Sequence, residues 1–127
     1  MAAAADSDYY IESFCKQVLS RDYFIRSARI TDHVGHTIAV AHREGLFPLM
    51  TPEESSRAAV QAAIRAATRD KFKSKIGGIL YSISRYVNLV RATVPINGGT
   101  KNRFLLLITF DIDAEVVQFF KRKFSRI

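Results

Sequence analysis

The sequence has very little cysteine, no tryptophan and few residues that break secondary structure. Its 127 residues include one cysteine, Cys15, with three prolines and six glycines. A single cysteine cannot form a disulfide within the chain, so nothing here calls for an oxidising compartment. Repeats, linkers and low-complexity tracts are also lacking beyond the first five residues. We therefore expect one domain over residues 1–127, with residues 1–6 disordered.

Long apolar segments are lacking as well. The longest apolar run near the N-terminus, Ala2 to Ala5, is followed at once by Asp6 and Asp8. Such a run is neither a signal peptide nor a membrane span, so we expect no transmembrane segment and a cytoplasmic protein. The hydrophobic fraction of 48% and charged fraction of 24% are those of an ordinary soluble domain with one core.

The chain also lacks the motifs of common enzymes and nucleic-acid-binding proteins. It has no Walker loop and no GxGxxG, and we interpret its glycine pairs at 77–78 and 98–99 as turns. No zinc finger, helix-turn-helix signature or RNA-binding aromatic motif is present. None of its serines lies in a nucleophile motif. We predict a protein that is not an enzyme and uses no cofactor.

All three histidines lie within ten residues, in HVGHTIAVAH at 33–42. His36 and His42 fall on the same face of an expected strand, but six residues at ~3.3 Å each separate them by roughly 20 Å. A zinc ion needs ligands within about 2 Å of one point, so these two side chains cannot share it. His33 and His36 could approach across a turn, which supplies only two ligands. We therefore predict no metal site.

Charge is distributed unevenly along the sequence. Residues 1–55 contain five Lys/Arg and eight Asp/Glu, a net charge of −3, whereas residues 56–127 contain 14 and four, a net charge of +10. A basic half favours acidic partners such as nucleic acid, an anionic surface or an acidic protein patch.

Hydrophobic periodicity predicts three helices and five strands. Three- and four-residue spacing predicts a helix over 7–22, and alternation around Gly35 predicts a hairpin of strands 24–31 and 36–41. Thr51, Pro52 and Glu54 form a capping-box pattern that begins a helix reaching residue 70–75. Three strand-like runs follow at 79–86, 87–96 and 103–112, the last two joined by a turn at 97–100. Asp113 is expected to cap a final helix over 114–124.

The order α-β-β-α-β-β-β-α predicts an α+β fold, a five-stranded, mostly antiparallel sheet with helices on its faces. It resembles the roadblock/LC7 family, whose members have a profilin-like fold and are small, dimeric and non-enzymatic. The resemblance is carried by SARITDHVGHTIAVAH as the first hairpin, by the alanine-rich helix after it, and by VRATVPINGGTKNRFLLLITF as the later hairpin. It is one of pattern over most of the chain and not of a diagnostic motif.

The central helix carries a stripe of small residues, which has two interpretations. The stripe comprises Ala58, Ala59, Ala62, Ala63, Ala66 and Ala67. It could pack flat against the helix's own sheet, or it could meet its own copy across a two-fold axis. The resemblance implies the second arrangement, because the corresponding helix lies at the dimer interface of roadblock-like proteins. We accordingly predict a homodimer interface formed by Ala59, Ala62, Ala63, Ala66, Tyr81 and Ile83.

Tyr81 and Ile83 belong to ILYSISRY, residues 79–86. In the roadblock pattern this strand is the sheet edge that pairs with the partner's edge. The alternative is an ordinary edge strand on which the charge of Arg85 disfavours pairing with another chain.

Two basic clusters are candidate contacts for an anionic partner. They comprise Arg65, Arg69, Lys71, Lys73 and Lys75 near the end of the central helix, and Lys121, Arg122 and Lys123 near the C-terminus. Solvated faces at helix ends are the ordinary explanation, since cations there complement the helix dipole.

The function predicted is that of a non-enzymatic homodimeric scaffold or regulatory protein that binds a partner protein, with a small GTPase as the candidate that the resemblance implies. One alternative is a PAS-like sensor domain that holds a small molecule between sheet and helix. Another is a nucleic-acid-binding protein that uses the basic C-terminal half.

Overall fold

Five strands form one sheet in the order β2-β1-β5-β4-β3, and every neighbouring pair is antiparallel. The structure is a computed structural model that describes the backbone of residues 2–97 and 103–123, and the side-chain surroundings of 9–96 and 103–122. The elements in chain order are α1 (Ala2–Leu19), β1 (Ile25–Asp32), β2 (Thr37–His42), α2 (Pro52–Arg69), the short 3-10 helix η1 (Asp70–Phe72), α3 (Lys73–Ile76), β3 (Ser82–Arg85), β4 (Leu89–Asn97), β5 (Arg103–Asp111) and α4 (Val116–Lys123).

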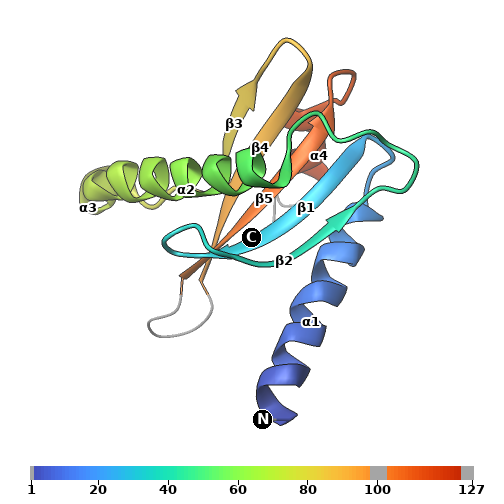
Figure 1. Ribbon diagram of the computed structural model, residues 1–127. Helices are drawn as coiled ribbons and strands as arrows, with labels where there is room; N and C mark the ends of the chain where they lie inside the picture. Colours follow the sequence, from blue (N-terminus) through green and yellow to red (C-terminus); the bar gives the residue numbers. More distant parts are fainter. Residues whose placement is uncertain (1, 98–102, 124–127) are drawn as a thin grey trace.

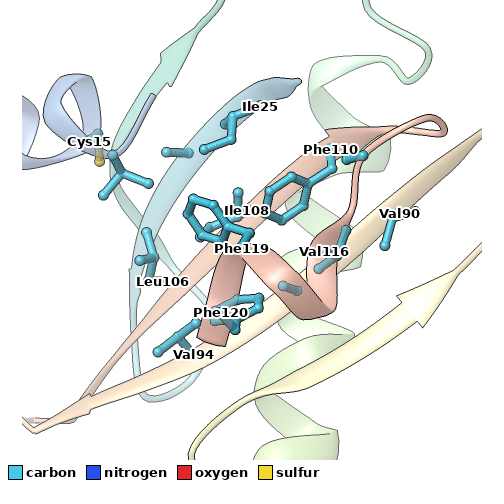
Figure 2. Close-up of a cluster of buried hydrophobic side chains, with 14 of the residues drawn as sticks. Cys15, Ile25, Val90, Val94, Leu106, Ile108, Phe110, Val116, Phe119 and Phe120 are labelled. Carbon is cyan, nitrogen blue, oxygen red and sulfur yellow. The ribbon is translucent and has the colours of Figure 1, made fainter. Parts of the chain in front are cut away.

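Helices α1 and α4 cover one face of this sheet, and the hydrophobic core lies beneath them. Alternate residues of β4 and β5, such as Val90, Ile108 and Phe110, point to this face and are almost fully buried. Cys15 of α1 and Phe120 of α4 belong to the same cluster, as Figure 2 shows. Period-two alternation along the strands thus decides which residues form the core.

Helix α2 crosses the opposite face of the sheet (Figure 1). Its start follows the predicted capping box. The Thr51 side chain accepts a hydrogen bond from the Glu54 N–H at 3.1 Å, and the Glu54 carboxylate accepts one from the Thr51 N–H at 2.9 Å. The helical path continues through η1 and α3 to Gly77, whose φ of +86° ends it.

Three element boundaries differ from the sequence-based prediction. Helix α1 begins at Ala2, before the predicted start at residue 7; four consecutive alanines have high helix propensity. The disorder expected for residues 1–6 stays a prediction. Strand β3 covers only Ser82–Arg85, because residues 77–81 return the chain from α3 to the sheet. Helix α4 begins at Val116, and Asp113 lies in the preceding turn instead of capping it. The turn predicted at 97–100 lies, from Gly98 onward, outside the described residues.

Candidate functional site

The alanines of α2 lie mostly between the helix and its own sheet. Ala59, Ala62 and Ala63 are buried within the single chain, and Ala66 is half-buried. They offer almost no surface to a second molecule. The three buried alanines are thus covered within the single chain, and the homodimer interface expected at Ala59, Ala62, Ala63 and Ala66 stays a prediction.

Tyr81 and Ile83 point toward α4 and not away from the molecule. The Tyr81 ring stacks on Phe120 with a centroid separation of 4.3 Å and an interplanar angle of 9°. Ile83 is half-buried and packs against the core cluster. These two side chains help to hold β3 in place, so what β3 can offer a partner is chiefly its backbone edge.

Large apolar side chains exposed to solvent flank β3 in the sequence. β3 is the last strand of the sheet and pairs with β4 on one side. The exposed fractions of Phe72, Ile76, Leu80 and Val87, which flank β3 in the sequence, are 60%, 82%, 69% and 89%. We call β3 and these four residues the β3-edge surface. An edge strand and exposed apolar side chains are each typical of an interaction site.

Sequence reasoning placed Leu80 on the expected edge strand 79–86 but did not single out Phe72, Ile76 and Val87 as part of this surface. Their positions in the sequence are close to turns, where periodicity says little about burial. A signal was nevertheless present, since Ile76 and Leu80 flank the glycine pair and could not both join the core through so short a connection.

The basic residues near the end of α2 are exposed, but some are engaged in contacts within the chain. The Arg69 guanidinium donates a hydrogen bond to the Ser82 hydroxyl at 3.0 Å, which ties α2 to β3. The Lys73 ammonium lies 3.5 Å from the Asp70 carboxylate, which also pairs with Arg103. Lys71 and Lys75 are exposed, as is Arg65, which lines a small cavity under α2.

The second basic cluster lies on the other face of the sheet. Lys121 and Arg122 are exposed on α4, whose opposite side packs into the core. Lys123 is the last residue of the helix, and the structure does not describe its side chain. Since α2 and α4 cover opposite faces, the fold does not join the two clusters into one basic patch.

The histidines are dispersed by the fold. His33 and His36 lie at the β1–β2 turn, where the His36 Nδ1 is 3.3 Å from the Asp32 carboxylate, while His42 ends β2. Among the described residues no group of three or more His, Cys, Asp or Glu could hold a metal ion. No described helix is both long and apolar enough to cross a membrane.

Solved structures with the same arrangement identify the fold. A roadblock/LC7 domain from Streptomyces avermitilis superposes with a TM-score of 0.65 at 11% identity, over 85% of this chain and 83% of that one. The chain has the roadblock/LC7 fold. MglB from Myxococcus xanthus gives a TM-score of 0.67 at 14% identity over 91% of this chain and 80% of its own. A structure of MglB with a tetrameric arrangement gives 0.66 at 18% identity, over 92% of this chain and 82% of that one.

These likenesses confirm the fold that the element order predicted. No protein-family model and no curated protein matches the sequence. At sequence identities of 11 to 18%, the likeness between this chain and these structures is a likeness of the backbone fold alone. Any function must therefore be argued from the surfaces of this chain.

Proposed function

We propose that this roadblock/LC7-fold protein is a non-enzymatic homodimeric scaffold or regulator that binds a partner protein. The observation that carries the proposal is the β3-edge surface, a strand that pairs only with β4 among the described residues and is flanked in the sequence by four exposed apolar side chains. Pairing of two β3 edges across a two-fold axis would satisfy their outward backbone groups and extend the sheet through both chains. The tetrameric arrangement of an MglB structure supports self-association for this fold.

A small GTPase is the class of partner that the roadblock/LC7 resemblance implies. The dimer would present two copies of α2 and one continuous sheet to such a partner. No catalytic group is assigned to this chain, so its contribution would be binding and positioning.

Oligomeric state tests the self-association. Sedimentation velocity between about 1 and 100 µM should show a dimer for the wild type and a monomer for the double variant Ile76→Asp/Leu80→Asp, because both side chains are exposed in the single chain and their replacement leaves the core unchanged. Val117→Asp is the matched control, an apolar side chain on α4 that is 53% exposed, and should remain dimeric. A wild type that is monomeric at 100 µM would contradict the proposal.

The partner class is tested separately. Tagged wild type and the double variant would be incubated with the same native lysate, and captured proteins identified by mass spectrometry. We expect a small GTPase to be retained by the wild type and lost from the monomeric variant. Capture that is equal for both would show that the partner does not need the dimer.

A further inference from the structure

The sheet face beneath α2 carries polar and positively charged side chains among apolar ones, unlike the apolar face beneath α4. Alternate residues of the central strands, among them Arg29 of β1, Arg91 of β4 and Thr109 of β5, line the space under the helix. On the helix side this space is bounded by Ala58, Ala59 and Ala62. Because alanine side chains are short, the helix leaves room above the arginines.

Two adjoining cavities occupy this space. One, of about 70 Å³, lies beneath the middle of α2, and the other, of about 370 Å³, opens toward the connection between β2 and α2 that Figure 1 shows at the end of the sheet. We call them together the α2 groove. They share six lining residues, Ser27, Arg29, His42, Ser55, Arg91 and Thr109. A volume of some hundreds of Å³ suits a small organic molecule.

The charge of the groove is not neutralised. Among the described residues that line either cavity none is acidic, and neither Arg29 nor Arg91 forms a described ion pair. Burial, and then the positive charge of Arg91, lower the pKa of Arg29 from its ordinary value. Both guanidinium groups line the same two cavities without a described carboxylate, and an anion bound there would offset their positive charge.

The present contacts of these arginines leave donors free for a ligand. Arg29 donates one hydrogen bond to the Thr37 hydroxyl at 2.6 Å, and Arg91 contacts the Met50 sulfur and lies over the Tyr86 ring at 5.8 Å. Each guanidinium has five N–H donors in a planar fork that matches a phosphate. The hydroxyl groups of Ser27, Ser55 and Thr109 can supply further hydrogen bonds.

A third arginine at the groove has a different role. The Arg43 guanidinium donates to the backbone carbonyls of Ile25, Leu19 and Asp22 at 2.8 to 2.9 Å. It is therefore engaged in holding the chain between α1 and β1. We assign anion contact to Arg29 and Arg91 and a structural role to Arg43.

The other wall of the groove is apolar. The connection from β2 to α2 places Leu46, Phe47 and Leu49 at the larger cavity, with exposed fractions of 40%, 88% and 55%. The Arg26 guanidinium donates to the Phe47 carbonyl at 2.9 Å and anchors this connection to β1. An aromatic or aliphatic part of a ligand would cover these side chains while its charged end meets the arginines.

We infer that the α2 groove binds a small organic phosphate, with the phosphate between Arg29 and Arg91 and an apolar or aromatic part against Leu46, Phe47 and Leu49. The inference does not depend on self-association, because Arg29, Arg91 and the apolar wall at Leu46, Phe47 and Leu49 lie outside the β3-edge surface, with which the groove shares Ser84. The structure of the ligand beyond this chemistry is left to the experiment.

Titration of the isotope-labelled full chain tests the site. Inorganic phosphate, pyrophosphate and adenosine monophosphate would be added at low ionic strength, and NMR resonances of backbone amides and arginine side chains followed. We expect shifts concentrated at residues 27, 29, 42, 55, 91 and 109, with adenosine monophosphate at least fivefold tighter than inorganic phosphate. Affinity should decrease as salt is raised. Absence of shifts in the groove with all three probes at 10 mM would overturn the inference, as would equal shifts over the lysines of α3 and α4.

Variants separate the two parts of the site. Arg29→Gln/Arg91→Gln should weaken binding of every probe at least tenfold, and circular dichroism should show that it folds. Lys121→Gln, which removes an exposed charge on the other face, should bind like the wild type. Phe47→Ser should weaken adenosine monophosphate but not phosphate. If the arginine variant loses a protein partner while no probe binds, the groove takes an acidic protein segment and the small-molecule inference is wrong.

Discussion

Gly35, at the tip of the β1–β2 turn, lies directly against the backbone of Val60 in α2. A Cβ atom at Gly35 would be 2.6 Å from the Val60 Cα and 2.9 Å from the Ala59 carbonyl oxygen. The φ of Gly35 is +94°, a conformation that L side chains rarely adopt. The hairpin turn is therefore a point where α2 rests on the sheet, and it limits how closely the helix approaches the arginines below.

Replacement of Gly35 should destabilise the fold by more than its backbone conformation alone explains. We expect Gly35→Ala to cost about 1–3 kcal/mol beyond Gly45→Ala, because its methyl group must displace the α2 backbone. Gly45 has a similar φ of +83° and no atom within 4 Å of a Cβ, so that variant has the conformational cost alone. Urea unfolding measures both. Equal losses of stability would show that the turn does not support α2.

The same turn makes stability depend on the charge of Asp32. Partial burial raises the pKa of its carboxyl group, but hydrogen bonds from the N–H groups of His36 and Val34, at 2.8 and 3.1 Å, outweigh this and hold the pKa below the ordinary value of 3.8. The folded state thus favours the carboxylate, which stabilises it above pH 3.8 and ceases to do so as the pH falls through the lowered pKa. Asp32→Asn should be less stable than the wild type near neutral pH, and the difference should shrink in acid.

Thermal unfolding between pH 2.5 and 7 checks this pH dependence. Asp113→Asn is a control at an exposed carboxylate in the turn before α4. A difference between Asp32→Asn and the wild type that is constant with pH would exclude the carboxylate as its source.

Cys15 should be inert in the folded protein. Its side chain is fully buried in the core, and burial raises the pKa of the thiol above its ordinary value of 9.0. Both effects lower the concentration of accessible thiolate, the reactive form. A thiol reagent at pH 8 should modify the native chain far more slowly than the chain in 6 M guanidinium. Rapid modification without denaturant would mean that α1 separates readily from the sheet.

The stack of Tyr81 on Phe120 should connect the edge of the sheet to α4. Phe120 is 1% exposed and also meets the rings of Phe110 and Phe119. Phe120→Ala should therefore reduce the free energy of unfolding by about 3–5 kcal/mol. Val117→Ala, at an exposed position on the same helix, should change it by less than about 0.5 kcal/mol. Denaturant unfolding followed by tyrosine fluorescence measures both variants.

Local patterns in the sequence predicted most of the elements. The spacing of Thr51 and Glu54 located the start of α2 because a capping box needs no distant residue. Alternation on either side of Gly35 located the first hairpin for the same reason. Boundaries were wrong where other elements decide them, as at β3, whose length depends on the path from α3 back to the sheet.

The interaction surfaces were predicted less well. A stripe of alanines is equally compatible with packing on a sheet and with packing on a second helix, and periodicity contains no information on the choice. Leu80 was placed on the expected edge strand, but the exposure of Ile76 was not predicted, because exposure depends on which other parts of the fold cover a side chain.

The sequence by itself determined the element order, the capping of α2 and the division of each strand into two faces, since these depend on residues near one another in the chain. Only the tertiary structure decided that Arg29 and Arg91 line one groove with His42, Ser55 and Thr109. The four strand residues come from β1, β4, β2 and β5, and the strand order β2-β1-β5-β4-β3 brings them under α2, which contributes Ser55. The positive charges of Arg29 and Arg91 and the hydroxyl groups around them can act together on a ligand only once the sheet has formed.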